Sequence, residues 1–177
     1  ALAKISGLKM VEFYRKQYDF PGISLTPCNI YGTNDSFDPL HSHVLSALVK
    51  KMVDAAESGV QSVSMWGTGI AKREFMHVDD LADACLYLML NYDGKLFVNA
   101  GTGVDVSIRE LAEIVKRVTG FQGELLFDTS KPDGTPRKLM DVSRLNDMGW
   151  KHKIDLEDGV RMVYEEVKQS DLFSISA

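Results

Sequence analysis

The stretch of residues 65–80 constrains the fold of this chain most, because it predicts a strand end, a glycine turn and a helix start in direct succession. Gly67 and Gly69 allow the backbone to turn sharply and leave room for a ligand. Lys72 and Arg73 follow, and they place two cations on the loop that we expect after the turn. Such a loop suits a phosphate group, although a plain turn with a solvated arginine fits the same pattern.

Apolar residues at helical spacing follow this stretch, and Asp79 or Asp80 is expected to cap the helix that they form. Short apolar strands alternate with periodic helices along the chain, which predicts an α/β fold. The pattern S-x-x-E from Ser107 to Glu110 predicts a capping box, and Gly120 is expected to end that helix. We expect helices near residues 1–20, 44–57, 79–92, 108–119, 141–149 and 156–167, strands within 22–32, 60–66, 95–100 and 123–128, and a loose tail over 170–177.

The composition is that of an ordinary globular protein, with 177 residues of which 45% are hydrophobic and 25% charged. A net charge of -5 argues against a nucleic acid or an anionic membrane as the partner. Since we find no membrane-length apolar run and no signal-peptide pattern, we expect a cytoplasmic protein. Cys28 and Cys85 are expected to be reduced thiols, and with four His and no paired Cys we predict no metal site.

Two patterns in the central stretch resemble a known enzyme family. W-G-x-G from Trp66 and R-E-F-x-H-V-x-D-L-A from Arg73 are similar to the substrate-binding signature of the extended short-chain dehydrogenases/reductases that act on nucleotide sugars. The resemblance implies the C-terminal part of an NAD(P)-binding Rossmann fold with a smaller mixed α/β substrate-binding domain. It places Arg73 on the diphosphate of the sugar nucleotide, with Met65 and Trp66 in the same binding wall. The Rossmann part would comprise residues 1–32 and 78–100, and the substrate-binding part residues 33–77 and 101–170.

The first helix carries a second match. A-L-A-K at the start, followed later by T-P-C-N-I-Y-G, resembles the Y-x-x-x-K helix of the same family and its next strand. Without this match, Lys4 would be interpreted as a surface lysine of a helix. The resemblance implies that Lys4 is the catalytic and cofactor-binding Lys of the family. It also implies that the catalytic Tyr directly precedes Ala1, outside this sequence. We therefore expect the helix to continue upstream. No G-x-G-x-x-G is present, so the loop that cradles the cofactor phosphates is not in this chain. By the resemblance, the residues beside the nicotinamide of NADP(H) are Pro27, Cys28, Asn29 and Ile30.

A polar, turn-rich loop over residues 34–43 leads to His43 at the start of the next helix. An imidazole titrates near neutral pH and suits proton transfer, although a loop His is more often only a polar surface residue. N-D-S-F-D-P-x-x-S-H-V resembles the GDP-L-fucose synthases within the family, in which the matching His donates a proton in epimerisation and lies at the cofactor. The same resemblance puts Val44, Leu48 and Lys51 at the substrate, and Lys51 stands where a relative carries an Arg for the diphosphate.

The sequence S-K-P-D-G-T-P-R-K, residues 130–138, is a cation-rich loop. Its charges can be solvated, or they can close over a diphosphate and a purine. It also resembles the GDP-L-fucose synthases, where this loop encloses the GDP, and this resemblance assigns Asp133 and Lys138 to the substrate.

Together the resemblances imply a homodimeric, NADP(H)-dependent enzyme that converts GDP-4-keto-6-deoxy-mannose into GDP-L-fucose. Such an enzyme epimerises C3 and C5 and reduces C4. The family's Cys partner of the epimerising His lies upstream of the Tyr, so Cys28 is not that residue. The alternatives are another nucleotide-sugar epimerase or dehydratase of the family, or a non-catalytic fragment that binds nucleotide sugar or a partner chain. The 177 residues alone are expected to be inactive.

Overall fold

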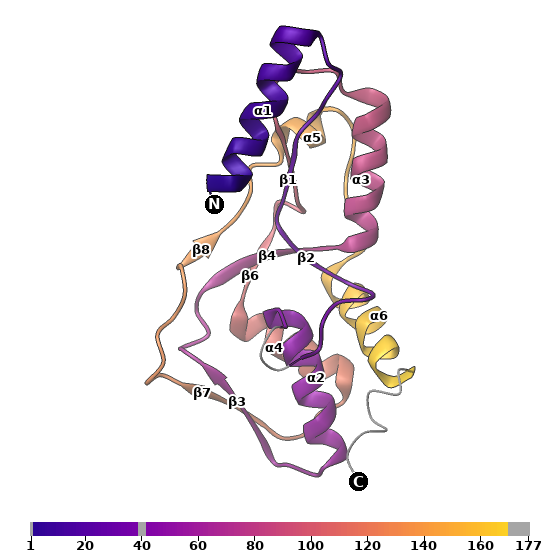
Figure 1. The fold of residues 1–177 in the computed structure, drawn as a ribbon. Coiled ribbons are helices and arrows are strands. Elements are labelled where there is room, and N and C mark those ends of the chain that lie inside the picture. Colours follow the sequence, from indigo (N-terminus) through magenta and orange to yellow (C-terminus); the bar gives the residue numbers. More distant parts are fainter. Residues whose placement is uncertain (1, 39–41, 170–177) are drawn as a thin grey trace.

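The structure, a computed structural model, describes residues 2–38 and 42–169 as two groups of helices joined by one central strand (Figure 1). Ala1, residues 39–41 of the predicted loop and the predicted loose tail over 170–177 lie outside the described residues. The upper group in Figure 1 contains α1 (Leu2–Tyr18), α3 (Val78–Asn91) and α5 (Ser143–Asp147). The lower group contains α2 (Val44–Glu57), α4 (Ile108–Thr119) and α6 (Leu156–Gln169). Within the described part of the chain, no helix combines the length and the apolar character that a membrane crossing requires.

The strands are short, and their order is β1 (Leu25–Pro27), β2 (Asn29–Tyr31), β3 (Ser62–Trp66), β4 (Lys72–His77), β5 (Val98–Ala100), β6 (Asp105–Ser107), β7 (Glu124–Asp128) and β8 (Arg137–Lys138). β1 pairs with β5, and β3 pairs with β7, both in parallel. β4 is the central strand because its two halves have different neighbours. Its first half pairs antiparallel with β6 and parallel with β8, and its second half pairs parallel with β2.

Two hydrophobic cores lie on either side of β4. The lower core is built from α2, α4, α6 and β3, and it includes Phe75 of β4. The upper core includes the next residue, Met76, with residues of α3, β5 and α5. Successive side chains of a strand point to opposite faces, so this one strand contributes to both cores. Leu145 and Trp150, which the predicted boundaries assign to the substrate-binding part, pack in the upper core.

The helix over 108–119 has the ends that the sequence predicts. The N–H of Glu110 donates to Ser107 Oγ at 3.1 Å, and the N–H of Ser107 donates to the Glu110 carboxylate at 2.7 Å. Gly120 follows with a φ of 71°, in the left-handed region that favours glycine. The capping box and the glycine stop are therefore confirmed, as is the α/β class.

Four local predictions were wrong. Arg137 and Lys138, which the predicted loop over 130–138 includes, form the short strand β8 because they pair with β4. The single strand expected within 22–32 is two strands in separate sheets, broken at Cys28 after the proline that cannot donate to a ladder. Lys72 and Arg73 lie on β4 rather than on a loop, because β6 and β8 pair with that segment. The cap of α3 is His77, whose Nδ1 accepts the N–H of Asp79 at 3.2 Å, so neither Asp79 nor Asp80 caps this helix.

Candidate functional site

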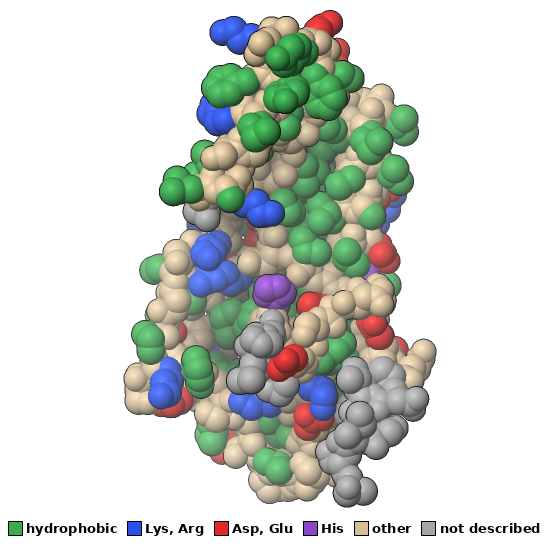
Figure 2. Space-filling view, viewed as in Figure 1, with side chains coloured by type: hydrophobic (Ala, Val, Ile, Leu, Met, Phe, Trp, Pro, Cys, Tyr) green, Lys and Arg blue, Asp and Glu red, His purple; other side chains and the backbone are tan. Residues whose placement is uncertain are grey.

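A cation-rich edge forms where the turn between β3 and β4 meets the loop over residues 129–136. Backbone bonds hold the two segments together. The N–H of Gly67 donates to the carbonyl of Asp128 at 2.9 Å, and the N–H of Lys72 donates to the carbonyl of Pro136 at 2.8 Å. Figure 2 shows Lys and Arg side chains gathered over β8 and the adjacent part of β4. We call this region the cationic edge and define it by Trp66, Arg73, Lys131, Asp133 and Lys138.

Asp133 fastens the loop to the turn. Its carboxylate accepts the N–H of Thr68 at 2.9 Å and the Thr68 hydroxyl at 2.7 Å. The hydroxyl and then the backbone N–H of Thr68 lower the pKa of the Asp133 carboxyl. Gly67 lies directly beneath this contact with a φ of 79°, and a Cβ there would overlap the carboxylate. The carboxylate is therefore engaged within the protein, where it sets the position of the loop.

Arg73 and Lys138 are neighbours across the β4–β8 pair. The Arg73 guanidinium donates to the carbonyls of Lys72 and Thr135, each at 2.6 Å, so it supports the loop while its charge has no carboxylate partner among the described residues. The Lys138 ammonium has no hydrogen bond or ion pair within residues 2–38 and 42–169. Two positive charges thus lie on neighbouring strands, and neither forms an ion pair with a carboxylate in the part of the chain that the structure describes.

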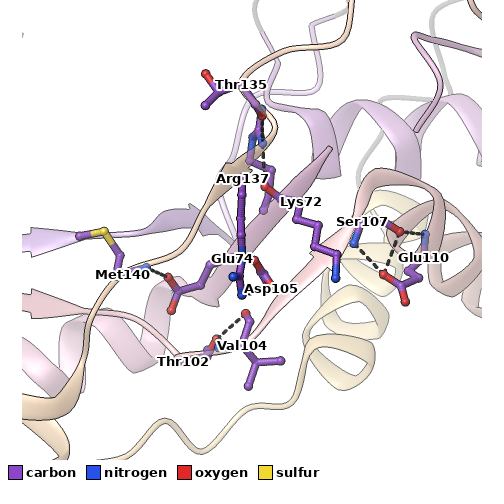
Figure 3. A network of polar contacts seen from close by, with 11 residues as sticks. Lys72, Glu74, Thr102, Val104, Asp105, Ser107, Glu110, Thr135, Arg137 and Met140 are labelled. Carbon is purple, nitrogen blue, oxygen red and sulfur yellow. Dashed lines mark hydrogen bonds and ion pairs between the residues drawn. The ribbon is translucent and has the colours of Figure 1, made fainter. Parts of the chain in front are cut away.

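Arg137, the other residue of β8, has a carboxylate partner (Figure 3). Its Nε donates to Asp105 Oδ2 at 2.5 Å and its NH2 donates to Oδ1 at 3.3 Å, a bidentate pair that lowers the pKa of the Asp105 carboxyl. The charge of Arg137 is therefore offset, and its side chain ties β8 to β6 across β4.

An exposed aromatic ring extends the cationic edge. The Trp66 side chain is 77% exposed, and Lys131 Nζ lies 6.0 Å from its ring centroid. Nearby, the Arg109 guanidinium lies 3.8 Å from the centroid of the Phe127 ring and donates to the carbonyl of Thr68 at 3.1 Å. An open indole face beside cations suits a flat, electron-rich base attached to a phosphate.

The structure places the other predicted substrate residues on and below α2. Val44 is partly exposed at the helix start, whereas Leu48 and Met65 are buried in the lower core. Lys51 donates from its Nζ to the carbonyl of Ser64 on β3. Leu48 and Met65 are therefore core residues in this structure, and neither is exposed at the cationic edge.

His43 directly precedes α2, is exposed, and makes no side-chain cap bond to the helix. Its imidazole is therefore accessible for proton exchange. Lys4 lies on the exposed α1, in the other group of helices, and makes no hydrogen bond or ion pair among the described residues. The structure brings Arg73, Lys138, Asp133 and Trp66 to one edge, while Lys4 and His43 lie on separate elements.

The predicted cofactor-side residues lie where β1 passes into β2. Pro27 and Asn29 are exposed, and Cys28 and Ile30 are half-buried. Burial, with a further contribution from the Glu74 charge, raises the pKa of the Cys28 thiol to about 12, so the thiol stays protonated and acts as a small apolar group. The Asn29 amide donates to the backbone carbonyl of Glu74 at 2.6 Å.

Glu74 was not among the residues that the sequence singled out. Its side chain is 0% exposed, although glutamate is rarely buried fully. Lys72, Arg73 and Glu74 form a charged run at the start of β4, and no local pattern marks Glu74 as the buried member of that run.

Comparison with known proteins identifies the family to which the chain belongs. The model of the NAD dependent epimerase/dehydratase family matches residues 1–101. The chain belongs to this family. Within the NAD dependent epimerase/dehydratase family, it is 52% identical to GDP-L-fucose synthase 1 of Arabidopsis thaliana over 165 residues, covering 93% of this chain and 51% of that protein. It is 45% identical to the GDP-L-fucose synthase of Escherichia coli K12 over 174 residues, covering 93% of this chain and 54% of that protein.

Among solved structures, the GDP-mannoheptose C4 reductase of Campylobacter jejuni, which has NADP bound, superposes with a TM-score of 0.84. It shares 39% sequence identity, over 95% of this chain and 59% of that one. The predicted resemblance and the fold, part of an extended short-chain dehydrogenase/reductase, are both confirmed. The chain spans about half the length of the curated relatives that it matches.

Proposed function

We propose that this chain is the C-terminal portion of a GDP-L-fucose synthase, which converts GDP-4-keto-6-deoxy-mannose into GDP-L-fucose. The observation that carries the proposal is the cationic edge, where Arg73 and Lys138 lie in register on neighbouring strands and lack carboxylate partners among the described residues. In the same edge, Lys131 lies beside the exposed Trp66 ring. A diphosphate supplies the missing negative charge, and guanidinium and ammonium groups are the usual ligands of phosphate oxygens. The similarity to GDP-L-fucose synthases supports GDP as the nucleotide.

In this proposal each part of the edge has a separate task. Arg73 and Lys138 bind the diphosphate, Trp66 covers the base, and Asp133 keeps the loop closed through Thr68. Lys51 adds a further cation from α2, and Val44 contacts the sugar nucleotide beside His43. Leu48 and Met65 contribute by packing, since both belong to the lower core.

NADP(H) is the proposed cofactor, and the residues present fit its nicotinamide end. Pro27, Cys28, Asn29 and Ile30 offer a partly apolar surface with a protonated thiol, which suits an uncharged ring. The unpaired ammonium of Lys4 suits the ribose hydroxyls and a neighbouring tyrosine. When bound, NADPH supplies the hydride for the reduction at C4. We also propose the homodimer and the cytoplasmic location that the resemblance implies.

Epimerisation needs a proton to leave and return at the carbons beside the 4-keto group, which makes those C–H bonds acidic. His43 is the proposed acid, and it also contacts the cofactor side of the substrate. Its exposed imidazole can exchange its proton with solvent between turnovers.

The function is tested by giving the full-length protein GDP-4-keto-6-deoxy-mannose and NADPH and identifying the product by NMR. GDP-L-fucose is the expected product. The similarity to a GDP-mannoheptose C4 reductase favours a second candidate, reduction at C4 without epimerisation. A product reduced at C4 with C3 and C5 unchanged would establish that candidate instead.

The substitution Arg73→Ala in the full-length protein is expected to weaken GDP binding about ten- to a hundredfold, because a charge-assisted contact commonly contributes about 1.5–3 kcal/mol. Calorimetric titration with GDP measures this, and NADPH affinity should stay the same. Arg161→Ala is the control, since Arg161 is exposed and pairs, among the described residues, with Glu157 at the surface of α6. Unchanged GDP affinity in Arg73→Ala would refute the assignment.

Lys138→Ala should weaken GDP binding in the same direction but less than Arg73→Ala. An ammonium on a flexible stem is a point charge without the bidentate fork of arginine. The same titration, repeated at two salt concentrations, should show a smaller salt dependence in the variant than in the wild type. A loss larger than that of Arg73→Ala would reverse the ranking.

A further inference from the structure

Glu74 is a buried carboxylate in the middle of the central strand, and its contacts link three segments. Its Oε1 accepts the N–H of Gly103 at 2.7 Å, and its Oε2 accepts the N–H of Met140 at 2.8 Å. Gly103 belongs to the loop between β5 and β6, and Met140 follows β8. Figure 3 shows Glu74 reaching from β4 to Met140. Both segments that flank β4 are therefore held by one side chain.

The carboxylate has no cation beside it in residues 2–38 and 42–169, and a Cβ on Gly101 would overlap its Oε1. A buried charge is costly unless strong hydrogen bonds offset its desolvation. Here two charge-assisted bonds from backbone N–H groups do so. The absence of a side chain at Gly101 is what allows the carboxylate to take this position.

These bonds fix the parts of the cationic edge. Arg73 immediately precedes Glu74 on β4, and Lys138 lies two residues before Met140. β8 has only two residues, so its own ladder holds it weakly, and the bond to Met140 secures its far end. The bond to Gly103 secures the start of β6, which carries the Asp105 that pairs with Arg137.

We propose that Glu74 is a positioning residue of the sugar-nucleotide site. Its carboxylate holds the segments around Gly103 and Met140 against β4, so that Arg73 and Lys138 keep the spacing that a diphosphate requires. This inference rests on the proposed function and adds to it a residue that touches neither substrate nor cofactor.

Charge and position predict opposite results for Glu74→Gln. Removing a negative charge near the site should strengthen the binding of an anion if charge alone matters. If Glu74 acts by position, binding weakens, because the new amide presents a donor to one of the two backbone N–H groups. In the full-length protein we expect GDP affinity to fall about tenfold or more. The KM for the sugar nucleotide should rise while kcat and NADPH affinity are largely kept.

Asp80→Asn is the matched control. Asp80 is also buried and also accepts two backbone N–H groups, those of Lys153 and Ile154, each at 3.0 Å. It holds the segment before α6 rather than the cationic edge. Its loss should lower thermal stability, as Glu74→Gln does, but leave GDP affinity unchanged. Gly101→Ala displaces the Glu74 carboxylate without removing its charge, and it should weaken GDP binding as Glu74→Gln does.

GDP titrations are made by calorimetry at a temperature where circular dichroism shows each variant folded. The inference is overturned if Glu74→Gln binds GDP as tightly as the wild type, or if Asp80→Asn loses as much GDP affinity as Glu74→Gln. In either case the proposed function still holds as long as the wild-type protein turns over its substrate. Wild-type protein that does not bind GDP overturns both. If the variants do not fold, amide hydrogen exchange measured on the wild-type protein tests the same inference. The amide hydrogens of Gly103 and Met140 should exchange slowly, and more slowly still when GDP is bound. Fast exchange of these amides both with and without GDP overturns the inference.

Discussion

Replacing His43 with Gln should reduce the rate of epimerisation about a hundred- to ten-thousandfold, the usual contribution of a general acid. Gln keeps a polar group of similar reach but has no proton that titrates near neutral pH. The affinities for GDP and NADPH should change little, because the imidazole makes no cap bond that holds α2 in place. The variant should still reduce the unepimerised ketone and release a GDP-6-deoxyhexose of the other configuration.

The measurement follows deuterium at C3 and C5 by NMR when the reaction of His43→Gln runs in deuterated water. Wild type should incorporate deuterium at both carbons, and the variant at neither on the same timescale. His152→Gln is the control, because it makes the same replacement in the segment between α5 and α6. If His43→Gln forms GDP-L-fucose at near the wild-type rate with normal deuterium uptake, His43 has no role in epimerisation and is an ordinary loop residue.

The helices of the lower core were largely predictable from the sequence because each has one buried face. Most apolar residues of α2, α4 and α6 recur at helical spacing and pack in the lower core, whereas Val44 and Met162 are exposed. The capping box at Ser107 needed no tertiary information, since both of its partners lie within one turn. Local patterns of this kind predict structure correctly because their contacts lie within one helix and do not depend on distant segments.

The central strand was not predictable in the same way. From Glu74 to His77 every residue of β4 is buried, because a core covers each face of the strand, so the segment lacks the alternation that marks a half-buried strand. Its partners β6 and β8 have three and two residues, too few to give any period. They become strands through backbone pairing with β4, a partner that is distant in the sequence.

The candidate site shows the same division. Motif resemblance located Arg73, Trp66 and the 130–138 loop, because short sequence patterns carry that information. It gave no partners for them, since Thr135, Thr68 and Asp105 are brought to the site by pairing between distant segments. The burial of Glu74 depends on backbone groups 29 and 66 residues away, which no local pattern reveals.

Lys4→Met should produce the complementary defect to His43→Gln. Met keeps the length and the apolar stem of the side chain but removes the positive charge. In the proposed enzyme that charge stabilises the ionised form of the neighbouring catalytic tyrosine and so holds its pKa within reach of neutral pH. Without it, proton delivery during the C4 reduction should slow about a hundred- to ten-thousandfold, and the pH profile of the reduction should move to higher pH. The direction follows because a phenol without a nearby cation ionises only at higher pH.

Epimerisation should survive in Lys4→Met, because His43 lies on a different element and needs no contribution from α1. In deuterated water the variant should therefore exchange C3 and C5 at close to the wild-type rate while GDP-L-fucose accumulates slowly. Lys9→Met is the matched control on the same helix, where Lys9 forms an exposed pair with Glu12. Because exposed pairs contribute little to stability, the control should show normal turnover. If Lys4→Met reduces C4 at the wild-type rate with an unshifted pH profile, Lys4 has no role in the reaction. If the variant loses both C4 reduction and deuterium exchange, reduction and epimerisation are not carried separately by Lys4 and His43.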